Sequence, residues 1–367
     1  MPLEASDTAF AIVFSVFVVI TLVLLVLVIR FTLQRAGIAR ARWLESEGVI
    51  PADRYEDEDE DDETDERPMT ALVLAGGGTR GALQIGMLQV LAEHGFVPDR
   101  IYGTSVGAVN GVAFAGDPTR AGVERMAEIW MGLTRDDVYP QGRLHGPWMY
   151  LQQRDSVFTN SGLRKVIEAG IDYERLEDAV VPVEVVATSL ADGQERWFTY
   201  GSAVDAVLAS TAIPAIFPPV DIGGDRYIDG AVVNNVPLRR AIDAGATRIV
   251  VLLCTPPTYT PGSPRRPVEA MLNALVISVH ARFAREMSQL PPGIEVIVCT
   301  GSEDKRQDFD DFSTTAALIA EGRSEAAEVV RRHHLAEPGP GAVPEGPAAY
   351  YSAPESPDPL THPDPAT

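Results

Sequence analysis

Apolar residues form two kinds of segment in the central part of the chain. Short apolar runs with the composition of buried strands occupy residues 71–74, 101–102, 183–188, 197–200, 248–252 and 295–298. Longer segments with helical spacing lie between and after these runs. Residues 81–94 stop at Gly95, a common helix end, and Ser313 is the expected N-cap of an amphipathic helix over residues 313–334. The alternation predicts an α/β fold, a three-layer sandwich with a mostly parallel central sheet.

The most apolar segment is residues 9–29, which contain no charged residue. About twenty such residues cross the hydrocarbon core of a bilayer as one helix. A cleaved signal peptide would open with basic residues, whereas Glu4 and Asp7 precede this segment. Arginines follow it within residues 30–42 and no Lys or Arg comes before it. We therefore expect a single-pass protein of the cell membrane whose main part lies on the cytoplasmic side.

Shifts in composition divide the chain into four parts. Residues 1–30 form the predicted membrane anchor, and residues 31–68 form an acidic linker in which positions 56–63 are all Asp or Glu. Such a run cannot bury enough apolar surface to fold. Repulsion from an anionic membrane surface would extend it and hold the domain clear of that surface. A plain solvated spacer is favoured over the alternative of a calcium or partner site. Residues 69–335 are the expected folded domain, and residues 336–367, rich in Pro, Gly and Ala, are an expected disordered tail.

Charge and cysteine content narrow the class of protein. The formal net charge is −22, which argues against nucleic acid as a main partner because phosphate backbones bind basic surfaces. The two cysteines, Cys254 and Cys299, each end an apolar run and are expected to be buried free thiols. Such thiols fit a reducing compartment. The sequence has no cluster of His, Cys and carboxylate residues that would suggest a metal site.

A glycine-rich loop follows the first predicted strand of the domain. Gly76, Gly77 and Gly78, with Arg80 and Gly81 after them, precede the first expected helix. Backbone N–H groups at a helix N-terminus point toward a bound anion, and the helix dipole favours negative charge there. The loop therefore suits either a phosphate or the oxyanion of a tetrahedral intermediate. Its Gly-x-Gly-x-x-Gly spacing leaves a nucleotide-binding enzyme open as an alternative.

A serine stands between two glycines directly after the second predicted strand. Gly103, Ser105 and Gly107 form a Gly-x-Ser-x-Gly sequence, which allows the tight strand-to-helix turn that exposes a nucleophilic hydroxyl. A dinucleotide-binding fold would instead place an acidic residue at the end of this strand to hold a ribose. The nearest candidate, Asp99, comes before the strand. The second motif thus favours a nucleophilic serine over a nucleotide site.

A serine nucleophile needs a general base, which is most often a histidine. The candidate histidines are His145, in a loop flanked by Gly and Pro, and His280, within a helical segment. Asp229 is the stronger candidate because it ends a short strand and precedes Gly230, where a turn fixes the carboxylate. Taken alone, however, the Asp229-Gly230 pair favours an ordinary hairpin turn, and only the other motifs reverse this preference.

Taken together, the loop at residues 76–81, the Gly-x-Ser-x-Gly elbow and the triplet Asp229-Gly230-Ala231 resemble, in this order, the three signature motifs of patatin-like phospholipases. Residues 209–219 resemble the segment that this family carries before its Asp motif. The resemblance implies a lipid acyl-hydrolase without a cofactor, in which Ser105 is the nucleophile and Asp229 the base of a Ser–Asp dyad. It also implies that Gly76, Gly77, Gly78, Arg80 and Gly81 form the oxyanion loop.

These roles carry further expectations. A carboxylate with the ordinary pKa near about 3.9 is a weak base, so Asp229 should be buried with a raised pKa. An acyl channel is one interpretation of the apolar residues Trp148, Met149, Tyr150, Leu151, Ile216 and Phe217, and ordinary core or lid packing is the other. The expected substrate is a membrane phospholipid or lysophospholipid. A non-catalytic membrane adaptor with the same fold is the remaining alternative.

Overall fold

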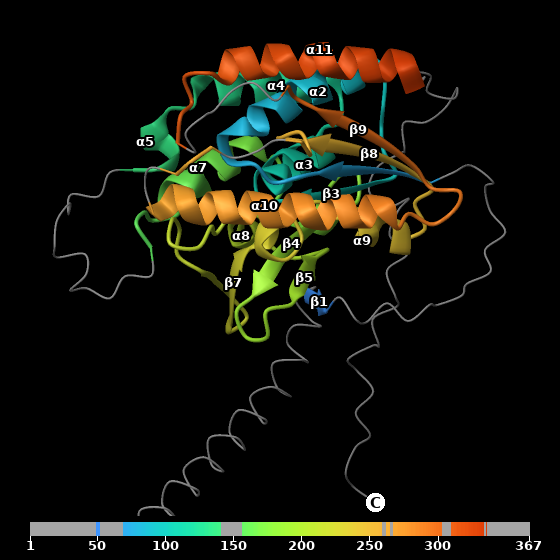
Figure 1. Ribbon diagram of the computed structural model, residues 1–367. Coiled ribbons are helices and arrows are strands. Elements are labelled where there is room, and N and C mark those ends of the chain that lie inside the picture. Colours follow the sequence, from blue (N-terminus) through green and yellow to red (C-terminus); the bar gives the residue numbers. More distant parts are fainter. Residues whose placement is uncertain are drawn as a thin grey trace, which may run out of the picture. The chain divides into compact units, whose positions relative to one another are not determined.

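A nine-stranded sheet forms the centre of the domain (Figure 1) in the part of the chain that the structure describes. This computed structural model describes residues 49–51, 69–140, 156–258, 262–264, 267–302, 310–333 and 335. The central strands are Thr70–Leu74 (β2), Arg100–Thr104 (β3), Val183–Ser189 (β4), Arg248–Leu253 (β8) and Glu295–Thr300 (β9). They run parallel in the order β4-β3-β2-β8-β9, and each lies at one of the predicted apolar runs.

The other strands pair antiparallel. They are Val49–Pro51 (β1), Glu195–Phe198 (β5), Val220–Ile222 (β6) and Asp225–Asp229 (β7). Both β5 and β7 pair with β4, and β1 pairs with β5. Tight turns with Gly193 before β5, and with Gly223 and Gly224 before β7, reverse the chain, because glycine readily adopts the positive φ of these turns. The expected mostly parallel sheet is therefore correct only for the five central strands.

Helices cover both faces of the sheet. One face carries Ala82–Glu93 (α2), Val106–Gly116 (α3), Arg120–Gly132 (α4) and Thr315–His333 (α11). The opposite face carries Leu238–Asp243 (α9) and Pro267–Ser288 (α10), which crosses the front of Figure 1 in orange. The shorter helices are Arg135–Val138 (α5), Ser161–Gly170 (α7) and Ala203–Ser210 (α8), and α8 packs on β4 and β7. The layers thus follow the predicted order of helices, sheet and helices.

Single 3₁₀ turns complete the described elements: Gly78–Gly81 (η1), Leu176–Asp178 (η2) and Gly230–Val232 (η3). The predicted helix at residues 81–94 corresponds to α2. The last helix is confirmed, but it begins at Thr315, so Ser313 is not its N-cap. The Ser313 N–H instead donates to Asp311 Oδ1 at 2.9 Å, which continues the preceding turn.

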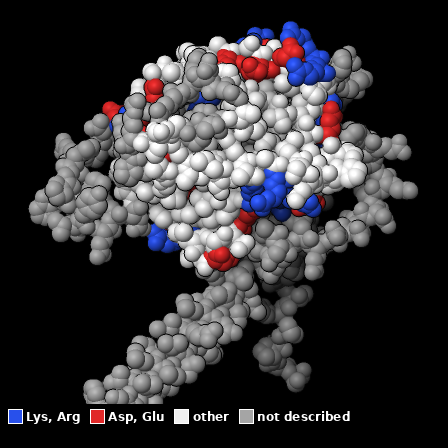
Figure 2. Space-filling view, viewed as in Figure 1, with Lys and Arg blue, Asp and Glu red and all other residues white. Residues whose placement is uncertain are grey.

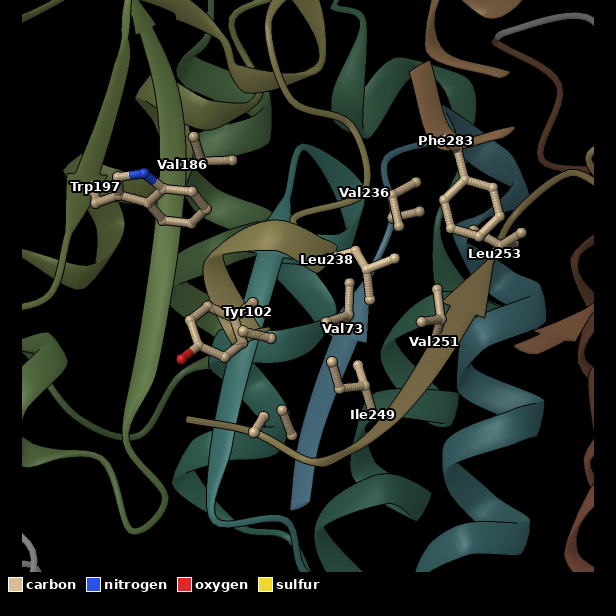
Figure 3. Close-up of a cluster of buried hydrophobic side chains, with 14 residues drawn as sticks. Val73, Tyr102, Val186, Trp197, Val236, Leu238, Ile249, Val251, Leu253 and Phe283 are labelled. Carbon is tan, nitrogen blue, oxygen red and sulfur yellow. The ribbon is translucent and has the colours of Figure 1, made fainter. Parts of the chain in front are cut away.

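The core between the sheet and α9 is apolar and includes one buried ion pair. Val73 and Val251 point from the sheet toward Leu238 of α9, and Phe283 of α10 closes the same cluster beside Leu253 (Figure 3). At the other end of the cluster, the Arg240 guanidinium lies over the Trp197 ring and donates to Glu184 at 2.8 Å. This pairing satisfies a charge that would be costly to bury alone.

Several expectations concern residues outside the described ranges. They are the membrane anchor at residues 1–30, the linker at residues 31–68 apart from β1, and the tail at residues 336–367. Strand β1 falls within the predicted linker, where no apolar run indicated it. Among the described residues, no helix is both long and apolar enough to cross a membrane.

Candidate active site

Ser105 occupies a strained turn between β3 and α3. Its backbone has φ 54° and ψ −125°, in the left-handed half of conformational space that residues with a side chain rarely adopt. The Ser105 carbonyl accepts the Ala108 N–H at 2.8 Å, so helix α3 begins at once. The turn is the strand-to-helix elbow that the Gly-x-Ser-x-Gly sequence predicted.

The two flanking glycines are required by close backbone approach. A Cβ on Gly107 would lie 2.2 Å from the carbonyl oxygen of Leu74, and one on Gly103 would lie 2.7 Å from Ala108 Cα. Any larger residue at either position would therefore push α3 away from β2 or from its own strand. The elbow depends on both glycines for steric reasons.

A second serine, Ser210, is buried beside the elbow and hydrogen-bonds to its backbone. Ser210, the last residue of α8, accepts the Ser105 N–H at 2.9 Å and donates its own proton to the Val186 carbonyl at 2.6 Å. Ser210 is fully buried. Its only signal in the sequence was its place within residues 209–219, the segment quoted for the family likeness.

We expect Ser210→Ala to reduce turnover about tenfold and to lower the free energy of unfolding by about 1–2 kcal/mol. The reason is that it leaves the buried Ser105 N–H without an acceptor. Ser202→Ala is the matched control, because Ser202 caps the other end of α8 by accepting the Asp205 N–H at 3.2 Å. Losing that cap costs about 1 kcal/mol of stability and leaves the elbow intact. Equal turnover in the two variants, measured with urea unfolding alongside, would contradict the role of Ser210.

Asp229 ends β7 and is held from several sides. Its N–H donates to the Ala212 carbonyl at 3.0 Å, and its own carbonyl accepts the Thr188 hydroxyl at 2.8 Å. Its carboxylate accepts the Ala231 N–H on Oδ1 at 2.8 Å and the Ser105 hydroxyl on Oδ2 at 2.7 Å. The two side chains that the sequence analysis paired are thus in direct contact, although 124 positions separate them.

The environment of Asp229 makes it a stronger base than an ordinary carboxylate. Its side chain is buried, with 1% of its surface exposed, and this burial raises its pKa to about 7. The hydrogen bonds from Ala231 and Ser105 oppose this shift but do not cancel it. A pKa near neutrality suits a group that must accept and return a proton.

The glycine loop lies beside this pair, and its amides have different partners. The Gly76 N–H donates to the Asn235 carbonyl at 3.3 Å, so it is not available as an oxyanion donor. Within the described residues, the N–H groups of Gly77 and Gly78 have no hydrogen-bond acceptor, and both residues line the same cavity as Ser105 and Asp229. They are the two amides of the loop best placed to receive an oxyanion.

Two other residues of the predicted oxyanion loop have structural contacts. The Gly81 carbonyl accepts the Asn110 side-chain amide at 3.1 Å, and Gly81 lines neither cavity that contains Ser105. The Arg80 N–H donates to Gly77 and its guanidinium donates to the Cys254 carbonyl at 2.7 Å. Of the five predicted residues, Gly76, Gly77, Gly78 and Arg80 line the cavity that contains Ser105 and Asp229, and Gly81 does not.

Two cavities meet at Ser105. The first has a volume of about 90 Å³ and is almost wholly apolar; it follows α3 past Val109 and Ala113 and is closed by residues that include Ile167 and Phe217. The second has a volume of about 200 Å³, is more polar, and contains Asp229, the glycine loop and the inner side of α10. An ester placed with its carbonyl at Ser105 would have one cavity for each of its two parts.

The remaining candidate residues have other positions. His280 lies on α10 with Nε2 3.1 Å from the Thr255 hydroxyl, and it lines neither cavity. Ile216 is buried in the core and does not line the apolar cavity, whereas Phe217 does. His145, Trp148, Met149, Tyr150 and Leu151 lie outside the described residues.

Neither cysteine belongs to a metal or disulfide site in the described part of the chain. Both are buried free thiols, as predicted. Burial raises the pKa of each thiol to about 12, so neither is a reactive thiolate at neutral pH. Across the described ranges no group of three His, Cys, Asp or Glu residues is arranged to hold a metal ion.

The fold and the site together define an α/β domain with a buried serine–aspartate pair at a strand-to-helix elbow, beside a glycine loop. Residues 72–242 match the family described as patatin-like phospholipase. This segment contains the glycine loop, Ser105 and Asp229. The domain formed by these residues therefore belongs to the patatin-like phospholipase family.

Individual relatives support this assignment. The chain is 31% identical over 191 residues to patatin-like phospholipase domain-containing protein 7 of Mus musculus, covering 50% of this chain and 13% of that protein. It is 28% identical over 225 residues to an NTE family protein of Mycobacterium bovis, covering 59% of this chain and 58% of that protein. It is 29% identical over 175 residues to the lysophospholipase NTE1 of Eremothecium gossypii, covering 46% of this chain and 11% of that protein. The chain thus matches only a small part of the mouse and Eremothecium proteins.

Proposed function

We propose that the chain hydrolyses fatty-acyl esters of membrane lipids, with Ser105 as nucleophile and Asp229 as general base. The observation that carries this proposal is the 2.7 Å hydrogen bond from the Ser105 hydroxyl to the buried carboxylate of Asp229. A relative named lysophospholipase supports a phospholipid or lysophospholipid as the substrate class.

The proposed cycle has two halves. Ser105 Oγ attacks the acyl carbonyl while its proton passes to Asp229 Oδ2, and the Gly77 and Gly78 N–H groups stabilise the oxyanion. The tetrahedral intermediate collapses, the alcohol leaves with the proton from Asp229, and the acyl group remains on Ser105. Water then attacks the acyl-enzyme while Asp229 takes its proton, and the return of that proton to Ser105 releases the fatty acid.

The two cavities suit the two parts of such an ester. The apolar cavity along α3 suits the acyl chain, because an alkyl chain gains free energy on leaving water and needs no polar partner. The larger, more polar cavity suits the alcohol part. A phosphate is a poorer fit for the glycine loop, because the Asp229 carboxylate shares its cavity and like charges repel.

Membrane attachment is a separate part of the proposal. It is supported by the uncharged segment at residues 9–29 and by the arginines that follow it. Protease treatment of intact and opened vesicles tests the orientation: the domain should be protected only when it lies inside the vesicle.

The test of the proposed function uses the full chain with a fluorophosphonate probe, p-nitrophenyl butyrate and a lysophospholipid. We expect labelling of Ser105, release of p-nitrophenol and release of fatty acid. Absence of both ester turnover and labelling in a folded protein would favour the non-catalytic adaptor. Tight binding of a nucleotide under the same conditions would favour a nucleotide-binding enzyme that uses the glycine loop for phosphate.

If the apolar cavity binds the acyl chain, filling its far end should reduce activity on long-chain esters more than on short-chain esters. Gly170 ends α7 and lines the cavity near Ala113, about 12 Å along α3 from Ser105 at 1.5 Å per residue. A Cβ on Gly170 would meet only Ile129 Cδ1, at 3.9 Å, which is an ordinary contact, so Gly170→Leu should fill the end of the cavity without a clash at its Cβ. We expect kcat/KM for p-nitrophenyl laurate to fall about tenfold relative to the butyrate, which corresponds to about 1.4 kcal/mol.

Gly132→Leu is the matched control for this substitution. Gly132 ends α4 as Gly170 ends α7, has no atom within 4 Å of its would-be Cβ, and lines neither cavity. Its laurate-to-butyrate ratio should equal that of the wild type. An unchanged ratio in Gly170→Leu would show that the acyl chain lies elsewhere.

A further inference from the structure

Helix α10 borders the cavity that contains the Ser105–Asp229 pair. Leu272, Val276 and Val279 line the cavity that contains both side chains of the pair. Their spacing of four and three residues places them on one side of the helix. The inner side of α10 is therefore a wall of the candidate active site.

The second half of α10 attaches the helix to the domain. Phe283 is buried in the core beneath the helix. The Arg282 guanidinium donates to the Val233 carbonyl and, at 2.9 Å, to the Glu195 carboxylate. His280 contacts the Thr255 hydroxyl at 3.1 Å. These contacts hold the helix in place over the cavity.

The outer side of α10 is uncharged over most of its length. Residues 270–281 contain no Asp, Glu, Lys or Arg, in a chain of which 22% of residues are charged. Ile277 does not line the cavity and is 60% exposed, more than any other large apolar side chain in the described ranges. Figure 2 shows a broad uncharged surface along this helix.

A basic residue stands just after the uncharged stretch. Arg285 follows it and is exposed, whereas Arg282 is bound to Glu195 and Glu286. Figure 2 shows Lys and Arg side chains beside the C-terminal half of α10. An exposed apolar side chain with a cation beside it suits an anionic lipid surface, because the apolar side chain inserts while the cation meets the head groups.

We propose that the outer face of α10, centred on Ile277, docks onto an anionic lipid bilayer and so presents the cavity behind it to lipid. This proposal rests on the proposed function, because it assigns the lipid surface as the partner of the same site. The proximity of the two features on one helix supports it: residues of α10 line the cavity that contains Ser105, and the same helix carries Ile277, the most exposed large apolar side chain in the described ranges.

The first test compares Ile277→Glu with Met131→Glu in the full chain, reconstituted in phosphatidylcholine vesicles with and without phosphatidylglycerol. Met131 is the matched control because it is a large apolar residue on a helix, 56% exposed, and lies on α4. We expect Ile277→Glu to reduce hydrolysis of vesicle lipid at least about tenfold, since a charge opposes insertion. Hydrolysis of p-nitrophenyl butyrate in solution should be unchanged in both variants. Equal loss of lipid hydrolysis in both variants, or none in either, would overturn the proposal.

The second test does not depend on activity. An environment-sensitive dye on Ile277→Cys should shift to the blue on vesicles with phosphatidylglycerol, and the same dye on Met131→Cys should not. The native cysteines are buried and should escape labelling. Arg285→Glu should reduce the preference for anionic vesicles. A blue shift without ester turnover would support the docking surface and contradict the proposed function. Ester turnover without a blue shift would support the proposed function and contradict the docking surface.

Discussion

Ser105→Ala is expected to abolish ester hydrolysis and fluorophosphonate labelling of the full chain. We expect turnover to fall by at least about 10⁴, since removing the nucleophile leaves only binding and the oxyanion donors to act. The fold should survive, because the Ser105 N–H keeps its bond to Ser210 and the elbow keeps its glycines. Alanine also has the Cβ that the turn already accommodates. Tm by circular dichroism should therefore stay near the wild-type value while activity disappears.

Ser161→Ala is the control for general effects of removing a serine hydroxyl. Ser161 is exposed at the start of α7 and lines neither cavity that contains Ser105. Its labelling and turnover should match those of the wild type. If the probe still labels Ser105→Ala, another residue is the nucleophile, and the assignment of Ser105 is wrong.

Asp229→Asn is expected to reduce turnover by about 10³ or more, because an amide cannot accept the proton of Ser105. The wild type should also show a pH dependence set by this carboxylate. Its pKa is raised to about 7, so the basic form is lost as pH falls through that value. We expect kcat/KM for p-nitrophenyl butyrate to rise about tenfold per pH unit below about 7 and to level off above it. A profile flat from about pH 5 to about pH 8 would exclude Asp229 as the base.

The same substitution should have the opposite effect on stability. Because burial raises the pKa of Asp229, the folded protein binds a proton between about pH 4 and pH 7 that the unfolded chain has released. Stability from this group is thus full at low pH and lost as pH rises through about 7. The amide of Asp229→Asn would be uncharged at every pH and would keep an oxygen for the Ala231 N–H.

We therefore expect Asp229→Asn to raise Tm by at least about 2 °C at about pH 8 and by clearly less at about pH 5, where the folded carboxyl is protonated. Thermal unfolding of both proteins at the two pH values measures it. A gain of equal size at both pH values would mean that the carboxylate titrates outside this range. A substitution that raises stability but lowers activity is typical of a residue whose function requires an unfavourable environment in the folded protein.

The strain and burial at the site have a common structural origin. Ser105 is held at positive φ by the bond from its N–H to Ser210, while β7 places Asp229 against it through pairing with β4. Both constraints come from β4, since the Val186 carbonyl of that strand also receives the Ser210 proton. The antiparallel side of the sheet is thus the part that brings the carboxylate to the elbow.

The local sequence was sufficient for features that depend on neighbouring residues. Apolar runs located the parallel strands, because a strand buried on both faces must be apolar throughout. The glycines around Ser105 indicated an elbow, because only a residue without a side chain allows such close approach. The position of Asp229 before Gly230 indicated a fixed carboxylate, and the order of the motifs indicated the family.

Tertiary structure alone decided features that depend on distant segments. The sequence did not reveal that the Ser210 hydroxyl accepts the Ser105 N–H or that the Asn235 carbonyl accepts the Gly76 N–H. Nor did it reveal that residues of α10 line the cavity. It also overestimated the parallel part of the sheet, because pairing direction depends on short turns at Gly193 and Gly224 that periodicity does not record. The pKa of Asp229 likewise follows from burial by the assembled domain. Such contacts join residues far apart in the chain, so no local pattern specifies them.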